Sequence, residues 1–135
     1  MASGSRRLGR ESALQVLYLR DLGACTPEQT PRGVWAAEPL TPKTRDFANH
    51  LAAGVQAHLT NIDGLITKYA QNWELHRMAA IDRCVLRLAT FELLYDLETP
   101  VSVIINEAVE IAKTFSTADS GKFVNGILDK IKQER

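Results

Sequence analysis

The sequence has no long apolar run, few cysteines and no excess of charge of either sign, and each absence excludes a class of protein. No segment approaches the ~18 uninterrupted apolar residues that a membrane span requires. The N-terminal segment contains arginines but no continuous apolar stretch and no plausible cleavage site, so it does not form a secretory signal. We therefore expect a soluble, cytoplasmic protein that folds as a single domain over residues 1–135.

Cys25 and Cys84 are the only cysteines, and they lie far apart in the sequence. A secreted scaffold of this size that is held by disulfides usually carries more cysteines, in even sets. Cys84 falls among Ile81, Val85 and Leu88, which predicts a small core residue.

Positive and negative charges balance, with 16 lysines plus arginines against 16 aspartates plus glutamates. This balance excludes a general electrostatic attraction to nucleic acid, so any such binding must use a local patch.

The sequence also lacks the motifs of common enzymes and metal sites. His50, His58 and His76 show no metal-ligand spacing, and neither HExxH nor CxxC is present. No glycine-rich loop follows a strand, and no serine lies in a nucleophile elbow. We therefore expect no catalytic residue, no metal and no cofactor, and we expect the three histidines to be solvated.

Two acidic residues fall on or beside the apolar face of one predicted helix. Glu92 falls within the stripe formed by Val85 and Leu88. Because burying an unpaired carboxylate is costly, we predict that Glu92 forms an ion pair or hydrogen bond with a neighbouring helix. Asp82 lies at the boundary between two apolar stripes, where it can face a ligand.

Glycine and proline divide the chain into helical segments, and no segment alternates with the period of a strand for long. A first helix is predicted over residues 6–22, ending at Gly23. A second begins at Thr41, with Pro42 at its first position. Thr60 and Asp63 resemble a capping box that starts or re-aims a helix. Between the first and second predicted helices, residues 24–40 hold Pro27, Pro31, Pro39 and Gly33 and are predicted to form a loop that can include one short helical turn over residues 34–38.

The C-terminal half is predicted to contain three further helices. The longest runs from a cap at Asn72 to Tyr95 and carries two apolar stripes, which places it at the centre of a bundle. The next covers residues 104–115. The last follows a cap at Ser116 or Thr117. The fold class is therefore all-α, with six or seven helices around one or two small cores.

Two surface patches combine cations with an aromatic ring. The first helix carries Arg6, Arg7 and Arg10, and helical spacing places Tyr18 on the same line as Arg7. Arginine on phosphate with an aromatic ring for base stacking is how single-stranded RNA is usually held. The last helix carries the second patch, in which Phe123 lies at the edge of the apolar face. It is flanked by Asp119, Lys122 and Gly126.

Three stretches of the sequence form recognisable motifs: RRLGRESALQVLY, IDRCVLRLATFEL and PVSVIINEAVEIAKTFSTADSGKFVNGILDKI. Together they closely resemble the NusB family of bacterial transcription antitermination factors. The resemblance implies a fold of two small packed helical bundles. It also implies binding of single-stranded boxA RNA together with NusE, a ribosomal protein of the small subunit. Such a complex acts on RNA polymerase indirectly, chiefly on ribosomal RNA operons.

The resemblance assigns roles to individual positions of this chain. The implied RNA-binding residues, to which we add Lys122 beside Phe123, are Arg6, Arg7, Arg10, Tyr18, Asp82, Lys122 and Phe123. Asp119 is the position tied to NusE. Gly9 departs from the family, in which alanine is common there. A glycine inside a helix costs about 1 kcal/mol relative to alanine, so the first turn is expected to fray without RNA.

One alternative from another class stays open on the sequence alone. The chain can instead be a helical protein-interaction module or a homodimeric scaffold with weak affinity for RNA. In that case a second copy occupies the surface of arginines and aromatic residues.

Overall fold

The computed structural model describes residues 2–23 and 40–135, and every regular element in these ranges is helical. The α-helices are α1 (Ala2–Asp21), α3 (Pro42–Ala57), α4 (Leu59–Tyr69), α5 (Ala80–Tyr95), α6 (Val101–Phe115) and α7 (Ala118–Ile131). Two short 3-10 helices, η1 (Leu75–Arg77) and η2 (Lys132–Glu134), complete the described chain. The predicted all-α class is confirmed, with six α-helices in the described ranges, whereas the loop predicted over residues 24–40 lies almost wholly outside them.

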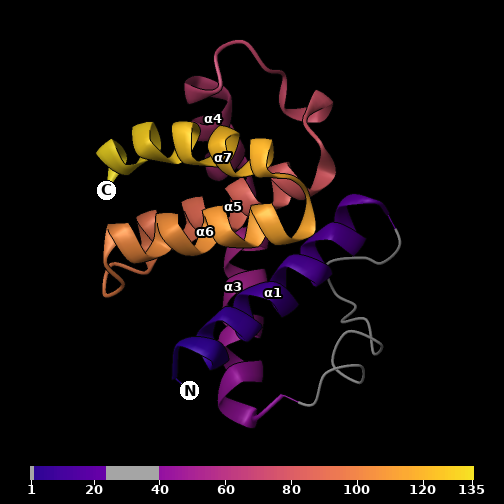
Figure 1. Cartoon of the computed structure of the whole chain (residues 1–135), viewed down its shortest axis with the longest axis vertical. Helices are drawn as coiled ribbons and strands as arrows, with labels where there is room; N and C mark the ends of the chain where they lie inside the picture. The colour runs from indigo at the N-terminus through magenta and orange to yellow at the C-terminus, as the bar shows by residue number, and fades with distance from the viewer. Residues whose placement is uncertain (1, 24–39) are drawn as a thin grey trace.

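Helix α5 lies at the centre of the fold. It contacts α1 and α3 on one hand, and α4, α6 and α7 on the other. Figure 1 shows α1 and α3 in one half of the molecule and the side-by-side pair α6 and α7 in the other. The stripes predicted for this helix therefore have the expected role, since Val85, Leu86 and Leu93 are buried between the two groups.

Three predicted helix ends are confirmed by their hydrogen bonds and backbone angles. Gly23 follows α1 with a φ of 77°, the left-handed conformation that glycine adopts without strain. The Thr41 hydroxyl oxygen accepts a hydrogen bond from the Thr44 amide at 3.2 Å. The Thr117 hydroxyl does the same for the Ser120 amide at 3.1 Å. Each side chain satisfies an amide that the first turn of a helix leaves unpaired.

Two other predicted helix starts are wrong. Helix α4 begins at Leu59 with His58 as its cap, so Thr60 lies inside the helix and does not start it. Asp63 instead accepts hydrogen bonds from Arg87. The predicted long helix from Asn72 is divided into η1 and α5, and α5 begins only after Ala79. In the first case the acid of the expected capping box joins α4 to α5 instead.

Cys84 is fully buried in the core, as predicted. Burial raises the pKa of its thiol to about 12, because the apolar surroundings disfavour the thiolate. Since the thiolate is the nucleophile, the native thiol is both inaccessible and protonated.

We therefore expect the Cys25→Ser variant, in which Cys84 is the remaining thiol, to resist Ellman's reagent at pH 8 while folded. It should react completely once urea unfolds the chain. The absorbance of the released thionitrobenzoate measures both states. Rapid reaction of the folded variant would contradict the burial of Cys84.

Gly9 allows α1 and α3 to approach each other closely. A Cβ atom at this position would lie 2.7 Å from the Cδ2 atom of Phe47 and 3.5 Å from the Thr44 carbonyl oxygen. The interpretation of Gly9 as only a weak point in the first helix is therefore incomplete, because the absent side chain makes room for the Phe47 ring.

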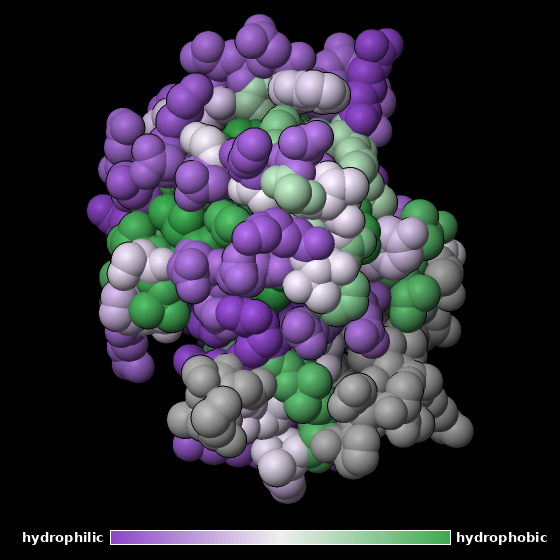
Figure 2. All heavy atoms as spheres, viewed as in Figure 1, coloured by the Kyte–Doolittle hydropathy of each residue, from purple (hydrophilic) through white to green (hydrophobic). Residues whose placement is uncertain are grey.

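The surface in the view of Figure 2 is mostly hydrophilic, with hydrophobic residues gathered over the beginning of α6. Leu97 and Val103 are among the exposed hydrophobic side chains of this region. Among the described helices, none combines the length and the apolar character needed to span a bilayer.

Candidate nucleic-acid interface

The three arginines of α1 have three different environments. Arg10 is buried, and its Nε and Nη2 donate to the two carboxylate oxygens of Glu92 at 2.9 and 2.8 Å. Its Nη1 also lies 3.4 Å from a carboxylate oxygen of Glu107. The predicted partner of Glu92 is thus found. Arg10 is 3% exposed, so it would have to leave Glu92 to reach a phosphate, and its contact with RNA stays a prediction.

Arg7 lies at the surface beside α6. Its Nε donates to Glu107 at 2.8 Å, and its Nη2 binds the second oxygen of the same carboxylate. This bidentate pair holds the pKa of Glu107 below its usual range and raises that of Arg7. One third of the Arg7 side chain remains exposed, so a phosphate must share this guanidinium with Glu107.

Arg6 is the exposed member of the cluster. Its guanidinium carbon lies 3.6 Å from the centroid of the Phe47 ring, a cation–π arrangement between α1 and α3. Stacking of this kind leaves the guanidinium edge free to donate hydrogen bonds. Among the three arginines of the motif, Arg6 has the geometry best suited to a phosphate.

Tyr18 and Asp82 are less accessible than the sequence indicates. Tyr18 is half-buried and packs against the main core. Asp82 lies in the first turn of α5, where the helix dipole favours a carboxylate, and is 8% exposed. Its Oδ1 atom has no hydrogen-bond partner within the described part of the chain. A ligand would reach only the edge of either side chain, and their contact with RNA stays a prediction.

A network of ion pairs that sequence reasoning missed joins α1, α4 and α5. Arg83 and Arg87 both donate to Asp21, at 2.6 and 2.9 Å, and Arg87 also binds Asp63 at 2.8 Å. Hydrogen bonds from Arg83, the largest cause, lower the pKa of Asp21. These two arginines hold α5 against α1 and α4. Their partners could not be predicted, because they lie far away along the chain.

The last helix carries the predicted Phe123 patch on the wall of a groove. This groove, of about 300 Å³, lies between α7 and the end of α4 with the turn that follows it. Phe123 lines it together with Lys122, and the Phe123 ring meets the Trp73 ring edge to face at 5.6 Å. Gly126 leaves open space beside them, as predicted, since a Cβ atom there would meet nothing within 4 Å.

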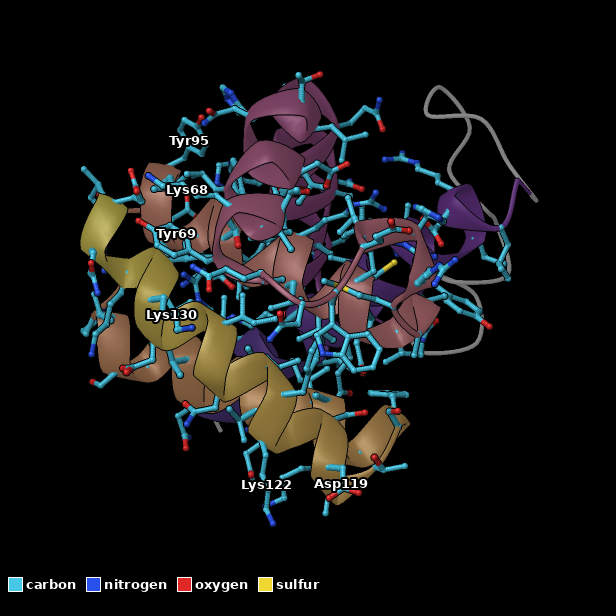
Figure 3. The ribbon with its side chains drawn as sticks, turned by 90° about the horizontal axis from the view of Figure 1, so that it is seen from above. Lys68, Tyr69, Tyr95, Asp119, Lys122 and Lys130 are labelled. Carbon is cyan, nitrogen blue, oxygen red and sulfur yellow. The ribbon has the colours of Figure 1, made fainter. Side chains whose placement is uncertain are left out.

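Asp119 and Lys122 both project outward near the beginning of α7 (Figure 3). Asp119 is exposed, and its neighbour Ala118 lines a second, larger groove of about 740 Å³ between α6 and α7. The apolar walls of this second groove come from Val101, Ile105 and Val109. The position predicted to bind a protein partner therefore lies next to a groove that combines apolar side chains with Lys113, Lys122 and Asp129.

The two predicted patches lie on helices that have different main neighbours. Helix α1 packs on α3 and α5, whereas α7 packs on α4, α5 and α6.

Of the histidines, His76 is exposed as predicted, while His58 is half-buried and stacks on Tyr95 with a ring separation of 3.9 Å. Within residues 2–23 and 40–135, no group of three His, Cys, Asp or Glu side chains could hold a metal ion.

Trp73 is the aromatic residue of the groove that sequence reasoning passed over. It lies in the short turn between α4 and η1, whereas the sequence predicts it in the first turn of the helix that follows Asn72. Its signal was a large aromatic residue next to a predicted helix cap, at a position with no apolar stripe to join.

A central helix with two groups of helices packed on it, and the exposed Trp73 and half-buried Phe123 beside Lys122, define this chain as a small all-helical binding protein. The profile of the NusB family matches residues 7–133, which is nearly the whole chain. The chain therefore belongs to the NusB family.

Individual relatives agree with this assignment. The chain is 45% identical to the transcription antitermination protein NusB of Syntrophotalea carbinolica, over 98% of this chain and 95% of that protein. The structure of T. maritima NusB superposes with a TM-score of 0.84 at 38% identity, covering 96% of this chain and 92% of that one. A crystal structure of the antitermination factors NusB and NusE in complex with double-stranded RNA gives a TM-score of 0.88 at 26% identity, covering 97% and 98%.

Proposed function

We propose that this chain is a non-catalytic, cytoplasmic RNA-binding factor of transcription antitermination that holds boxA RNA jointly with NusE. It would reach RNA polymerase only indirectly, through the antitermination complex on ribosomal RNA operons. Membership of the NusB family supports this proposal, as does the likeness to a NusB–NusE complex that contains RNA. The observation that carries it is the placement of Phe123 and Lys122 together on one open groove.

The proposed division of labour follows from the geometry of the side chains. Lys122 neutralises a phosphate while Phe123 stacks on a base, and the exposed Arg6 holds a second phosphate beside Phe47. Arg7 contributes by exchanging part of its contact with Glu107 for a phosphate. Asp119, exposed at the start of α7, contacts NusE. Because the net charge is zero, the chain binds RNA through local patches and together with the partner protein.

A titration of fluorescently labelled boxA RNA with this chain, alone and with NusE, tests the proposal directly. We expect binding in both cases and tighter binding with NusE. Stacking requires unpaired bases, so a duplex of the same sequence should bind more weakly. Absence of binding in every arm would overturn the proposed function. Sedimentation addresses the alternative: a stable dimer that RNA does not affect would favour the homodimeric scaffold.

The Lys122→Gln variant is expected to bind boxA RNA with a flatter dependence on salt. Each phosphate contact on a single strand contributes about −0.7 to the slope of log K against log salt, so the slope should change by about that amount. Titrations across several salt concentrations measure it. Arg45→Gln is the matched control, because Arg45 is exposed on α3 and lines none of the grooves described above. Equal slopes for the two variants would remove Lys122 from the phosphate-binding residues.

A further inference from the structure

We propose that Trp73 provides a second base-stacking surface beside Phe123, with Lys122 and Lys130 holding the phosphates on either side. Tyr69, Trp73, Lys122, Phe123 and Lys130 all line the same groove. This inference rests on the proposed function, because it extends the RNA path from Phe123 across the groove. Its occupant is an unpaired segment of RNA.

Trp73 is exposed yet held in place. More than half of its surface, 53%, is open to solvent, although a ring of this size is usually well covered. Its amide donates to the Ala70 carbonyl oxygen at 2.8 Å, which fixes the turn after α4. The edge-to-face contact with Phe123, at an interplanar angle of 76°, orients the ring. A ring that is already oriented loses little conformational freedom when a base stacks on it.

Two lysines flank these rings along α7. Lys122 and Lys130 are exposed and lie eight residues apart, which is about 12 Å along a helix axis. Gly126 stands one turn after Lys122 and one turn before Lys130, and it adds no side chain to the wall. Figure 3 shows Lys122 and Lys130 at different turns of the same helix. Two cations with aromatic rings between them match the charge and the spacing pattern of a single strand better than those of an apolar peptide.

The acidic residues around the groove, Glu74, Asp129 and Glu134, all form ion pairs. Glu134 accepts hydrogen bonds from the Tyr69 hydroxyl and from Lys68, the latter at 3.2 Å, and both lower the pKa of its carboxyl. Asp129 forms an ion pair with Lys132 at 2.6 Å. These pairs reduce the repulsion that a phosphate would meet beside Lys130.

The Trp73→Ala variant, with NusE present, should bind boxA RNA about tenfold more weakly than the unaltered chain, since stacking on one aromatic ring contributes roughly that factor. Trp73→Phe should retain most of the affinity, because a ring face remains. Tyr95→Ala is the matched control: Tyr95 is an exposed aromatic residue at the C-terminal end of α5, and it does not line the groove. Equal affinity of Trp73→Ala and the unaltered chain would overturn the inference.

Tryptophan fluorescence gives an independent readout. In a Trp35→Phe background the emission comes from Trp73 alone, and stacking of a base should quench it as boxA RNA is added. RNA binding without quenching would overturn the inference while leaving the proposed function intact. Failure of the unaltered chain to bind RNA would overturn both. Weaker binding of NusE to Trp73→Ala without RNA would assign this surface to the partner protein instead. Circular dichroism confirms that each variant is folded.

Discussion

Replacing Glu92 by alanine is expected to lower the free energy of unfolding by about 3–5 kcal/mol. The side chains of Arg10 and Glu92 are 4% and 2% exposed and form two hydrogen bonds with each other. Without Glu92 the Arg10 guanidinium stays buried with a longer contact to Glu107, at 3.4 Å, and the Phe47 ring 5.4 Å away. A buried charge that loses its partner carries its full cost of desolvation. Urea unfolding followed by circular dichroism measures the change.

The double variant Arg10→Met with Glu92→Leu provides the control. Replacing both members of a buried ion pair with apolar side chains of similar size is often neutral or stabilising. The double variant should therefore recover most of the stability lost by Glu92→Ala. A double variant as unstable as the single one would show that the packing of these side chains matters here, and not the charge left unpaired.

The same double variant tests the role of Arg10 in RNA binding. If Arg10 acts only by fixing α1 against α5, the folded double variant should keep the salt dependence of boxA binding. If Arg10 leaves Glu92 to contact a phosphate, the slope should flatten by about 0.7. Sequence reasoning places Arg10 with Arg6 and Arg7, and the buried pair separates it from them.

The helical core could be predicted from the sequence because helical periodicity is a local property. Apolar residues at helical spacing are all buried on the last two helices: Ile104, Ala108, Ile111 and Ala112 on α6, and Val124, Ile127, Leu128 and Ile131 on α7. The caps, predicted at Thr41 and at Ser116 or Thr117, could also be predicted from the sequence, since a cap bonds an amide only three residues away.

The partners of charged side chains could not be predicted in the same way. Arg7 pairs with Glu107 and Arg10 with Glu92, across 100 and 82 residues of sequence. Nothing local tells a solvated arginine from one that pairs with a distant helix. Glu92 was the exception, because its position on an apolar stripe required a partner even though the partner could not be named.

The candidate site divides along the same line. Phe123 and Gly126 were found because both lie on one helix, whose apolar face could be predicted from the spacing of its apolar residues. Trp73 was not found, because it belongs to a turn and meets Phe123 only in the folded chain. When a site is formed by a helix and a turn, helical periodicity predicts only the residues that the helix contributes.

Replacing Gly54 by alanine is expected to destabilise the protein by at least about 2 kcal/mol. A Cβ atom on Gly54 would lie 2.1 Å from the Cζ atom of Phe91 and 2.3 Å from its Cε1 atom. Phe91 is buried on α5, so its ring cannot swing into solvent. The overlap must therefore be relieved by moving α3 away from α5, which opens the core between them. Thermal and urea unfolding measure the loss.

Gly64→Ala is the matched control for this substitution. Gly64 lies in the middle of α4, and a Cβ atom there would meet nothing within 4 Å. Both substitutions gain the same helix propensity, which favours alanine by up to about 1 kcal/mol. Gly64→Ala should therefore be as stable as the unaltered chain or more stable, and the difference between the two variants isolates the steric effect at Phe91. If Gly54→Ala matched Gly64→Ala, the close approach of α3 and α5 at this glycine would be refuted, since an overlap of that size with a buried ring cannot be absorbed without cost.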